Sequence, residues 1–405
     1  MDNNQHLKSK IKTLIDISFH FFFLGCISFG GPAAHIGYFQ KTFVEKLKWV
    51  SQERYSGYIA LSQFLPGPGS SQVGFSIGYS KGGLLGAVTA FIAFTAPSFM
   101  LMLMLAKSTT ISTTASPIFL NVVSMLKILA VAVVADAIFT MYKQFCNNAA
   151  TIAVTLISAI LLCIYNNIVM QLAIISISLL AGSLFYKKLT LSNAKVTTTR
   201  AVNKGLANVN WFVFSTFVLL FLVLPLLTFL GPKIALFSDF YRAGSLVFGG
   251  GHVVLPMLED IIQGQLSKDT FIFGYAAAQA IPGPMFTFAT FLGAELLSDN
   301  MLAGALIATV AIFLPGFLLI IAFKESWQKI SKINQVAGAI ACVNAAVVGL
   351  LISAFYQPIL VSAIHSYWDG LIAVAGFLAL RIFKLPVLLV VFIYMALGFG
   401  IAVLK

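Results

Sequence analysis

Long apolar runs, separated by short polar segments, dominate the chain. They cover residues 82–106, 121–142, 151–165, 170–185, 211–230, 302–323, 336–356, 370–382 and 385–404. A helix rises about 1.5 Å per residue, so about 20 residues cross a hydrocarbon core roughly 30 Å thick. Most runs reach that length, and the shorter ones need a neighbouring helix or thinner lipid. The pattern predicts an all-α polytopic membrane protein.

Composition and charge agree with a membrane protein. Hydrophobic residues make up 59% of the chain and charged residues 9%, which no soluble globule has. The net charge of +12 raises the question of nucleic acid. The Lys and Arg residues, however, fall in short loops between apolar runs, as the positive-inside rule requires. We therefore expect no nucleic-acid partner. The four cysteines lie singly, without metal or disulfide spacing, so we expect no metal, and we also expect no cofactor.

Three landmarks of the first half recur in the second half. The segments SFGG and VFGG pair Gly30 and Gly31 with Gly249 and Gly250, 219 residues apart. Pro97 and Pro315 form a further pair. Between the FGG segment and this proline, each half has a PGP segment. QFLPGP and QAIPGP match at a separation of 216, pairing Gln63, Pro66, Gly67 and Pro68 with Gln279, Pro282, Gly283 and Pro284. The three landmarks occur in the same order in both halves and at nearly the same separation, which indicates a duplication. We predict residues 1–186 and 209–405 as the halves and residues 187–208 as a cytoplasmic linker.

Loop charges predict how the halves are oriented. Between its FGG and PGP segments the first half carries Lys41, Lys46, Lys48 and Arg54 against Glu45 and Glu53. The second half carries Glu259, Asp260 and Asp269 there, against Lys268. Because short cytoplasmic loops collect Lys and Arg, the two loops are expected on opposite faces. The extra apolar run 211–230 would invert everything after it. We therefore predict an inverted-topology repeat with a cytoplasmic N-terminus and broken or re-entrant helices at the FGG and PGP segments.

Both kinds of segment interrupt an apolar helix. Adjacent glycines lack the Cβ that disfavours left-handed backbone, so an FGG segment can turn sharply and expose amide N–H groups. Two prolines around a glycine cannot continue a helix, and the second proline suits the first turn of a new one. The freed backbone groups are tolerable only where they are buried in protein or line a watery cavity.

Such interruptions favour an anion. The N-terminus of a helix presents N–H donors and about half a positive charge. Ser70, Ser71 and Gln72 follow the first PGP and Thr287 follows the second, so hydroxyl and amide groups can bind oxyanion oxygens. We expect a cradle for a tetrahedral dianion between the PGP and FGG turns. The competing interpretation, that these segments are only kinks for close packing, is weakened by their recurrence at four equivalent places.

Ionisable residues near or within apolar runs are further candidates, because charge is costly in a membrane. His35 and His252 each follow an FGG segment. Either binds a dianion when protonated, passes a coupled proton, or is satisfied by backbone carbonyls. Arg242, ahead of the second FGG, neutralises an anion or reaches the interface. Asp136 is a proton-coupling candidate, with a helix-packing hydrogen bond as the alternative.

At these segments the sequence resembles the chromate ion transporter family in its long-chain, two-domain form. The resemblance rests on SFGGPAAHIGYF, QFLPGPGSSQVGFSIG, VFGGGHVVLP and GYAAAQAIPGPMFTFATFLGA, and it spans nearly the whole chain. It implies a multi-pass carrier of the bacterial cytoplasmic membrane that exports chromate and confers resistance. Sulfate, a near isostere, is the competitor or alternative substrate, and some members are thought to take it up. The implied partners are a small inorganic oxyanion and the lipid bilayer.

Other classes of protein fit less well. The chain has no HExxH, no phosphate-binding glycine loop and no paired intramembrane aspartates, so we do not expect an enzyme. An anion channel stays open, because broken helices serve channels and carriers alike. The sequence also leaves open the direction of transport, the coupling ion and a homodimer.

Overall fold

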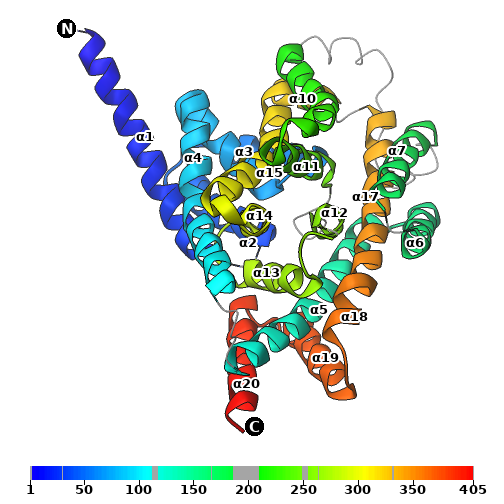
Figure 1. Cartoon of the computed structure of the whole chain (residues 1–405). Coiled ribbons are helices and arrows are strands. Elements are labelled where there is room, and N and C mark those ends of the chain that lie inside the picture. Colours follow the sequence, from blue (N-terminus) through cyan, green and yellow to red (C-terminus); the bar gives the residue numbers. More distant parts are fainter. Residues whose placement is uncertain are drawn as a thin grey trace. The chain divides into compact units, whose positions relative to one another are not determined.

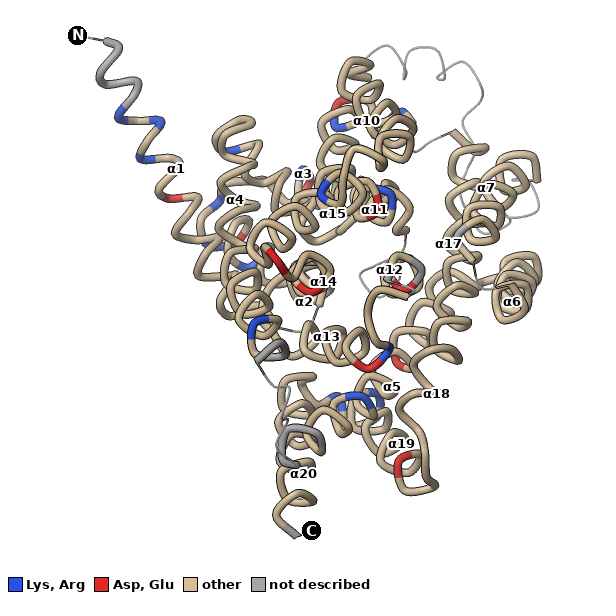
Figure 2. The backbone as a smooth tube through the Cα atoms, viewed as in Figure 1, with Lys and Arg blue, Asp and Glu red and all other residues tan. Residues whose placement is uncertain are grey.

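The computed structural model describes residues 2–29, 31–111, 117–165, 167–185, 209–248, 254–262, 264–330 and 333–404. Within these ranges the regular secondary structure is helical, with no strand. Five helices there are long and apolar enough to cross a membrane: Gly69–Ser108, Asn121–Phe145, Trp211–Leu230, Ser298–Phe323 and Asn334–Ala363. Figure 2 shows that charged residues are sparse along most helices. The predicted all-α polytopic architecture is confirmed.

The chain divides into two compact units, and each takes segments from both halves of the sequence. Unit 1 comprises Met1–Thr113, Thr216–Ser245 and Ala277–Ile320. Unit 2 comprises Thr114–Ser215, Leu246–Ala276 and Ile321–Lys405. The duplicated halves therefore do not each form a unit of their own.

The first-half part of unit 1 surrounds an aromatic core. Its elements are α1 (Asp2–Ile27), α2 (Gly31–Phe39), the π-helix η1 (Gln40–Lys46), α3 (Gln52–Phe64) and α4 (Gly69–Ile111). Helix α1 packs along α4, as Figure 1 shows. Phe21 of α1 stacks on Phe43 of η1 with ring centroids 4.6 Å apart, and Phe39 and Phe94 also contact it. These buried rings fix α2 and η1 against the α1–α4 pair.

Helix α4 is in fact a helical hairpin. Its backbone leaves helical geometry at Gly82 and Gly83, where Gly83 has φ +62. Gly78 and Gly86 then meet across the turn, and a Cβ on either would collide with the carbonyl oxygen of the other. Residues eight apart in one continuous helix would lie about 12 Å apart, so the chain reverses here. Glycine at both positions allows the two arms to pack at backbone contact.

The second half of the sequence forms a matching hairpin in unit 1. It consists of the 3-10 helix η5 (Met285–Thr287), α14 (Phe288–Leu296), η6 (Ser298–Asn300) and α15 (Met301–Phe323), of which residues up to Ile320 belong to this unit. Gly293 and Gly304 meet backbone to backbone as Gly78 and Gly86 do. The hydroxyls of Thr290 and Thr309 also lie 2.7 Å apart between the arms. Each PGP segment is thus followed by a glycine-packed hairpin.

A second pair of equivalent contacts joins each hairpin to the helix that precedes its FGG segment. Helices α10 (Trp211–Val223), η3 (Leu224–Leu230) and α11 (Pro232–Leu246) open the second half. In α1, a Cβ on Gly25 would collide with the carbonyl oxygen of Phe94. In α11, a Cβ on Gly244 would collide with that of Ile312. The glycines that correspond in sequence therefore make corresponding contacts, which agrees with a duplication.

Unit 2 is built around two long helices, α5 and α17. Its elements are α5 (Pro117–Phe145), α6 (Ala149–Ile164), α7 (Ile168–Leu184), α12 (Val254–Ile262), most of α13 (Lys268–Ala280), α16 (Trp327–Ile330), α17 (Asn334–Ala354), η7 (Phe355–Leu360), α18 (Val361–Ala363), α19 (Tyr367–Arg381) and α20 (Val387–Leu404). Helix α17 packs on α6 and α7, where Gly349 faces the carbonyl of Thr155. The Thr155 hydroxyl also donates to the Ala345 carbonyl at 2.8 Å.

Candidate functional site

The first PGP segment separates α3 from α4 and is held by one buried amide. Gly67 has φ +119, a conformation that side chains strongly disfavour. The Gln72 Nε2 donates to the Pro66 carbonyl at 2.9 Å and to the Gly316 carbonyl at 3.2 Å. Gln72 therefore ties the loop of the first half to α15 of the second half.

The second PGP segment ends α13 and is held by the first half. Gly283 has φ +103, and its N–H donates to the Ser28 carbonyl at 2.9 Å. A Cβ on Gly283 would lie 2.8 Å from the Ser98 Oγ. This loop therefore rests on the end of α1 and on α4.

These two arrangements are reciprocal. Gly67 faces Gly316, and a Cβ on Gly67 would lie 2.9 Å from the Gly316 Cα. Gly283 faces Ser98 in the same way. Ser98 and Gly316 directly follow Pro97 and Pro315, the third pair of repeated landmarks. Each PGP loop thus lies against the mid-helix proline position of the other half, and unit 1 contains both contacts.

His35 joins the first FGG region to both PGP loops. Its ring is fully buried in α2, with Nε2 3.2 Å from the Ser28 carbonyl oxygen and Nδ1 3.2 Å from the Ser70 Oγ. A carbonyl oxygen only accepts, so Nε2 donates, and in the neutral ring Nδ1 accepts the Ser70 hydroxyl proton. The Ser28 carbonyl receives both this bond and the Gly283 N–H. The His35 and Phe94 rings also form an edge-to-face pair, with their centroids 5.3 Å apart.

Several hydroxyl groups around this cluster are buried without a hydrogen-bond partner among the described residues. They are the Ser28 Oγ, the Ser71 Oγ and the Thr95 Oγ1. Ser71 lies in the first turn of α4, where backbone N–H groups have no helical acceptor. A buried hydroxyl without a partner costs free energy, about 1–3 kcal/mol. Such groups are suited to receive a polar ligand.

The two predicted charged candidates both form ion pairs. Arg242 Nη2 lies 3.2 Å from Asp239 Oδ1, one turn away in α11. Asp136 belongs to unit 2, where its Oδ1 lies 3.5 Å from Nη1 of Arg381. This ion pair links α5 to α19, so Arg381 is the partner for the alternative interpretation of Asp136 as a helix-packing residue.

The other predicted residues take varied places. Gln63 is exposed, Gln279 donates to the Met285 sulfur at 3.2 Å, and the Thr287 hydroxyl donates to the Pro284 carbonyl at 2.7 Å. Gly31 begins α2 with φ +75. Pro68, Gly283 and Pro284 are buried, and Pro66 and Pro282 are partly buried. Gly30, Gly249, Gly250 and His252 lie outside the described residues.

Sequence reasoning missed some members of the cluster. Ser28, Thr95, Ser98 and Gly316 were not among the predicted residues, although two of them adjoin the repeated Pro97 and Pro315. It also passed over an ion pair in unit 2, where Lys127 Nζ lies 2.6 Å from Asp269 Oδ1 and the Lys127 side chain is 13% exposed. The signal for that pair was an ionisable residue inside an apolar run.

Comparison with known proteins identifies the family. The family model described as chromate transporter matches residues 15–186 and 234–399. The chain belongs to the chromate transporter family. The two matched regions lie on either side of the predicted linker, and together they cover well over half of the chain. The predicted family is thereby confirmed.

Curated relatives match along most of their length. A probable chromate transport protein of Synechococcus elongatus is 28% identical over 353 residues, which is 84% of each chain. A chromate transport protein of Pseudomonas aeruginosa is 26% identical over 336 residues, 81% of this chain and 76% of its own. An uncharacterized transporter of Methanocaldococcus jannaschii is 26% identical over 344 residues, 84% of this chain and 83% of its own. No solved structure matches the chain.

Family membership and the five apolar helices together make this chain a membrane transporter. They agree with the predicted multi-pass protein of a bacterial cytoplasmic membrane. Transport is a function of a non-enzymatic kind, and the substrate class of a chromate transporter is an oxyanion.

Proposed function

We propose that the chain is a secondary transporter that carries chromate across the cytoplasmic membrane in the outward direction and so confers resistance, with sulfate as a competing ion. The substrate assignment is supported by the family and by relatives named as chromate transport proteins. Outward direction and resistance follow from the family resemblance of the motifs. Sulfate enters because it is a tetrahedral dianion of closely similar shape.

The substrate site of this proposal lies in unit 1 at the two PGP loops and the end of α1. The observation that carries it is the set of buried hydroxyls without partners, on Ser28, Ser71 and Thr95, beside the cluster of His35 and Gly283. Hydroxyl and N–H donors bind oxyanion oxygens without placing a fixed charge in the membrane, so the free energy needed to release the anion stays small. The first turn of α4 adds N–H donors and its positive dipole end.

His35 is the coupling residue in this proposal. In the neutral ring Nδ1 accepts the Ser70 hydroxyl proton, so that hydroxyl is not available to a ligand. Protonation places a hydrogen on Nδ1, which then donates to the Ser70 oxygen. The Ser70 hydroxyl turns to donate elsewhere, and the ring becomes positive. One proton therefore adds both a charge and a hydroxyl donor for the dianion.

The reciprocal contacts of the two PGP loops support a mechanism of alternating access. We propose that the halves form an inverted repeat, as the opposite loop charges predict, and that rocking of one hairpin against the other exposes the site to each face in turn. The contacts of Gly67 with Gly316 and of Gly283 with Ser98 are then equivalent contacts made by the two halves. Reporter fusions test the topology: Lys48 and Asp260 on the same face would contradict it.

Flux measurements in proteoliposomes test the transport proposal. Purified protein is reconstituted, an inward or outward pH gradient or potential is imposed, and labelled chromate and sulfate are followed separately. We expect saturable chromate flux that sulfate inhibits and that responds to the pH gradient. Flux that rises linearly without saturation would indicate a channel, and absence of chromate flux from folded protein would refute the substrate.

A further inference from the structure

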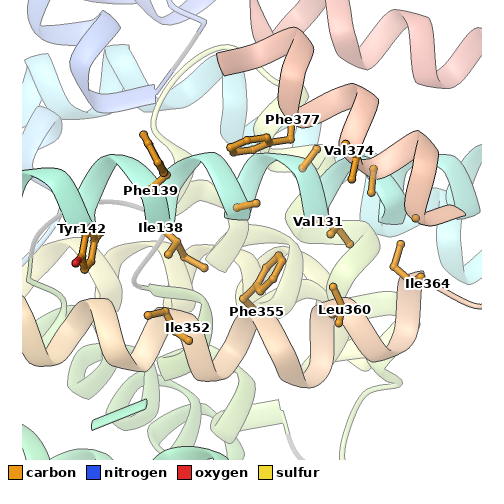
Figure 3. Close-up of a pocket in the computed structure, with 14 residues that line it drawn as sticks. Val131, Ile138, Phe139, Tyr142, Ile352, Phe355, Leu360, Ile364, Val374 and Phe377 are labelled. Carbon is orange, nitrogen blue, oxygen red and sulfur yellow. The ribbon is translucent and has the colours of Figure 1, made fainter. Parts of the chain in front are cut away.

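Unit 2 contains an apolar cavity of about 600 Å³ between α5, the η7 end of α17 and α19. Figure 3 shows its side chains, with Val131 towards one end of the cavity and Tyr142 towards the other. Apart from the Tyr142 hydroxyl, the lining side chains are aliphatic or phenyl groups. A cavity of this size suits an organic ligand. It offers almost no hydrogen-bond partner to an oxyanion, so it is not a second substrate site.

Positive charge gathers at one end of this cavity. The Arg381 guanidinium carbon lies 4.3 Å from the ring centroid of Phe139, and the Lys143 Nζ lies 4.6 Å from the same centroid. Phe139 itself lines the cavity. Lys143 directly follows Tyr142, and Arg381 lies one turn beyond Phe377 on α19. Both cations therefore stand at the Tyr142 end.

Arg381 retains donors for a further anion. Its Nη1 lies 3.5 Å from Asp136 Oδ1 and donates to the Thr140 hydroxyl at 3.3 Å. Both contacts use Nη1, which leaves Nε and Nη2 to bind a further acceptor. The side chain is 32% exposed, and Lys143 is exposed. A guanidinium with two adjacent N–H groups matches a phosphate in two-point geometry.

We propose that this cavity holds an acyl chain of an anionic phospholipid whose phosphate is bound by Arg381 and Lys143. A ligand with a long apolar part and an anionic group at one end matches both features, and free phosphate matches only the second. Lys143 and Arg381 also lie in the last turns of α5 and α19, and the positive-inside rule predicts that these helix ends are cytoplasmic. Anionic lipids are concentrated in that leaflet, where basic pockets between helices bind their head groups.

Lipid binding to the delipidated protein in detergent tests the proposal. Native mass spectrometry compares phosphatidylglycerol with phosphatidylcholine of identical acyl chains. We expect a clear preference for phosphatidylglycerol. Lys143→Gln, which leaves the pair of Asp136 with Arg381 intact, should weaken phosphatidylglycerol binding about fivefold, and Arg381→Gln should weaken it at least as much. Phosphatidylcholine should respond little to either change.

Two further variants separate the cavity from general surface charge. Lys81→Gln removes another exposed lysine that lies over an aromatic ring, Trp49 at 4.9 Å, and should leave the preference unchanged. Ala135→Phe fills the cavity and should weaken both lipids. Equal binding of the two lipids by the unchanged protein would overturn the proposal. So would a preference that persists in the Lys143→Gln, Arg381→Gln double variant, or tighter binding of a single-chain fatty acid than of phosphatidylglycerol.

Discussion

Gly67 and Gly316 lie 249 positions apart in sequence, yet a Cβ on Gly67 would lie only 2.9 Å from the Gly316 Cα. The equivalent contact in the other direction is between Gly283 and Ser98. Both PGP glycines also have positive φ angles, +119 and +103. Space and backbone conformation therefore independently require glycine at the two positions, which links the repeated motif to the packing of the two halves.

Gly67→Ala and Gly283→Ala should each abolish saturable chromate flux. The added methyl group imposes a disfavoured backbone conformation, which costs about 1–3 kcal/mol, and it meets atoms already at contact distance. Flux in proteoliposomes, normalised to inserted protein, measures the effect. Gly57→Ala is the matched control, because a Cβ there has nothing within 4 Å, and it should transport normally. Normal flux in both PGP variants would place the transport pathway elsewhere.

Gln72→Leu should loosen the first PGP loop. The substitution removes the amide that donates to the Pro66 and Gly316 carbonyls and leaves a partly buried and a buried acceptor without this donor. We expect the free energy of unfolding to fall by about 1–3 kcal/mol. Thermal unfolding in detergent measures it, and flux should fall together with stability. Gln52→Leu, at an exposed site in α3, is the control, and equal effects of the two changes would contradict the role of Gln72.

His35→Gln should remove the response of flux to the pH gradient. Glutamine retains one hydrogen-bonding amide but takes up no proton, so neither the positive charge nor the released Ser70 hydroxyl can form. Flux at acidic pH should fall about tenfold, which corresponds to one lost charge-assisted hydrogen bond. The readout is the pH profile of flux. A variant whose profile keeps the shape of the unchanged protein would show that the proton is carried elsewhere.

Gly304→Ala should destabilise the second hairpin. Its Cβ would collide with the carbonyl of Gly293, so the two arms would have to separate and the hydroxyl pair of Thr290 and Thr309 would break. We expect a loss of about 1–3 kcal/mol, the cost of overpacking. Thermal unfolding compares it with Gly400→Ala, whose Cβ has nothing within 4 Å. No difference between the two variants would show that the arms can separate without cost.

Much of the fold was predictable because membrane helices and their interruptions depend on local chemistry. Apolar runs predicted the long helices, and proline with glycine predicted where α3 and α13 end. The hairpin inside α4 was not predicted, because the apolar run was counted only from residue 82, the position of the reversal at Gly82 and Gly83. Residues 82–106 were accordingly taken as one span, without the helical arm that precedes the turn.

The site was predictable only in part. The repeated PGP and FGG motifs led to His35, Ser70 and Gly283, which the structure brings together. Ser28 and Ser98 escaped notice, because their roles depend on contacts between segments about 185 to 255 residues apart, which local patterns do not encode. The same limit hid the partner of Asp136, because only tertiary structure brings Arg381 to it. The partner of Arg242 is local, since Asp239 lies three residues before it on the same helix.

Equilibrium binding of labelled chromate to the purified protein tests the central claim most directly, since it measures the site without the transport cycle. Ser28→Ala and Ser71→Ala remove buried hydroxyls that have no partner in the described structure, and each should weaken binding about tenfold without lowering thermal stability. Thr89→Ala, whose hydroxyl donates to its own helix, should bind as the unchanged protein does. Chromate affinity that is the same in all three variants would contradict a site at the PGP loops of unit 1.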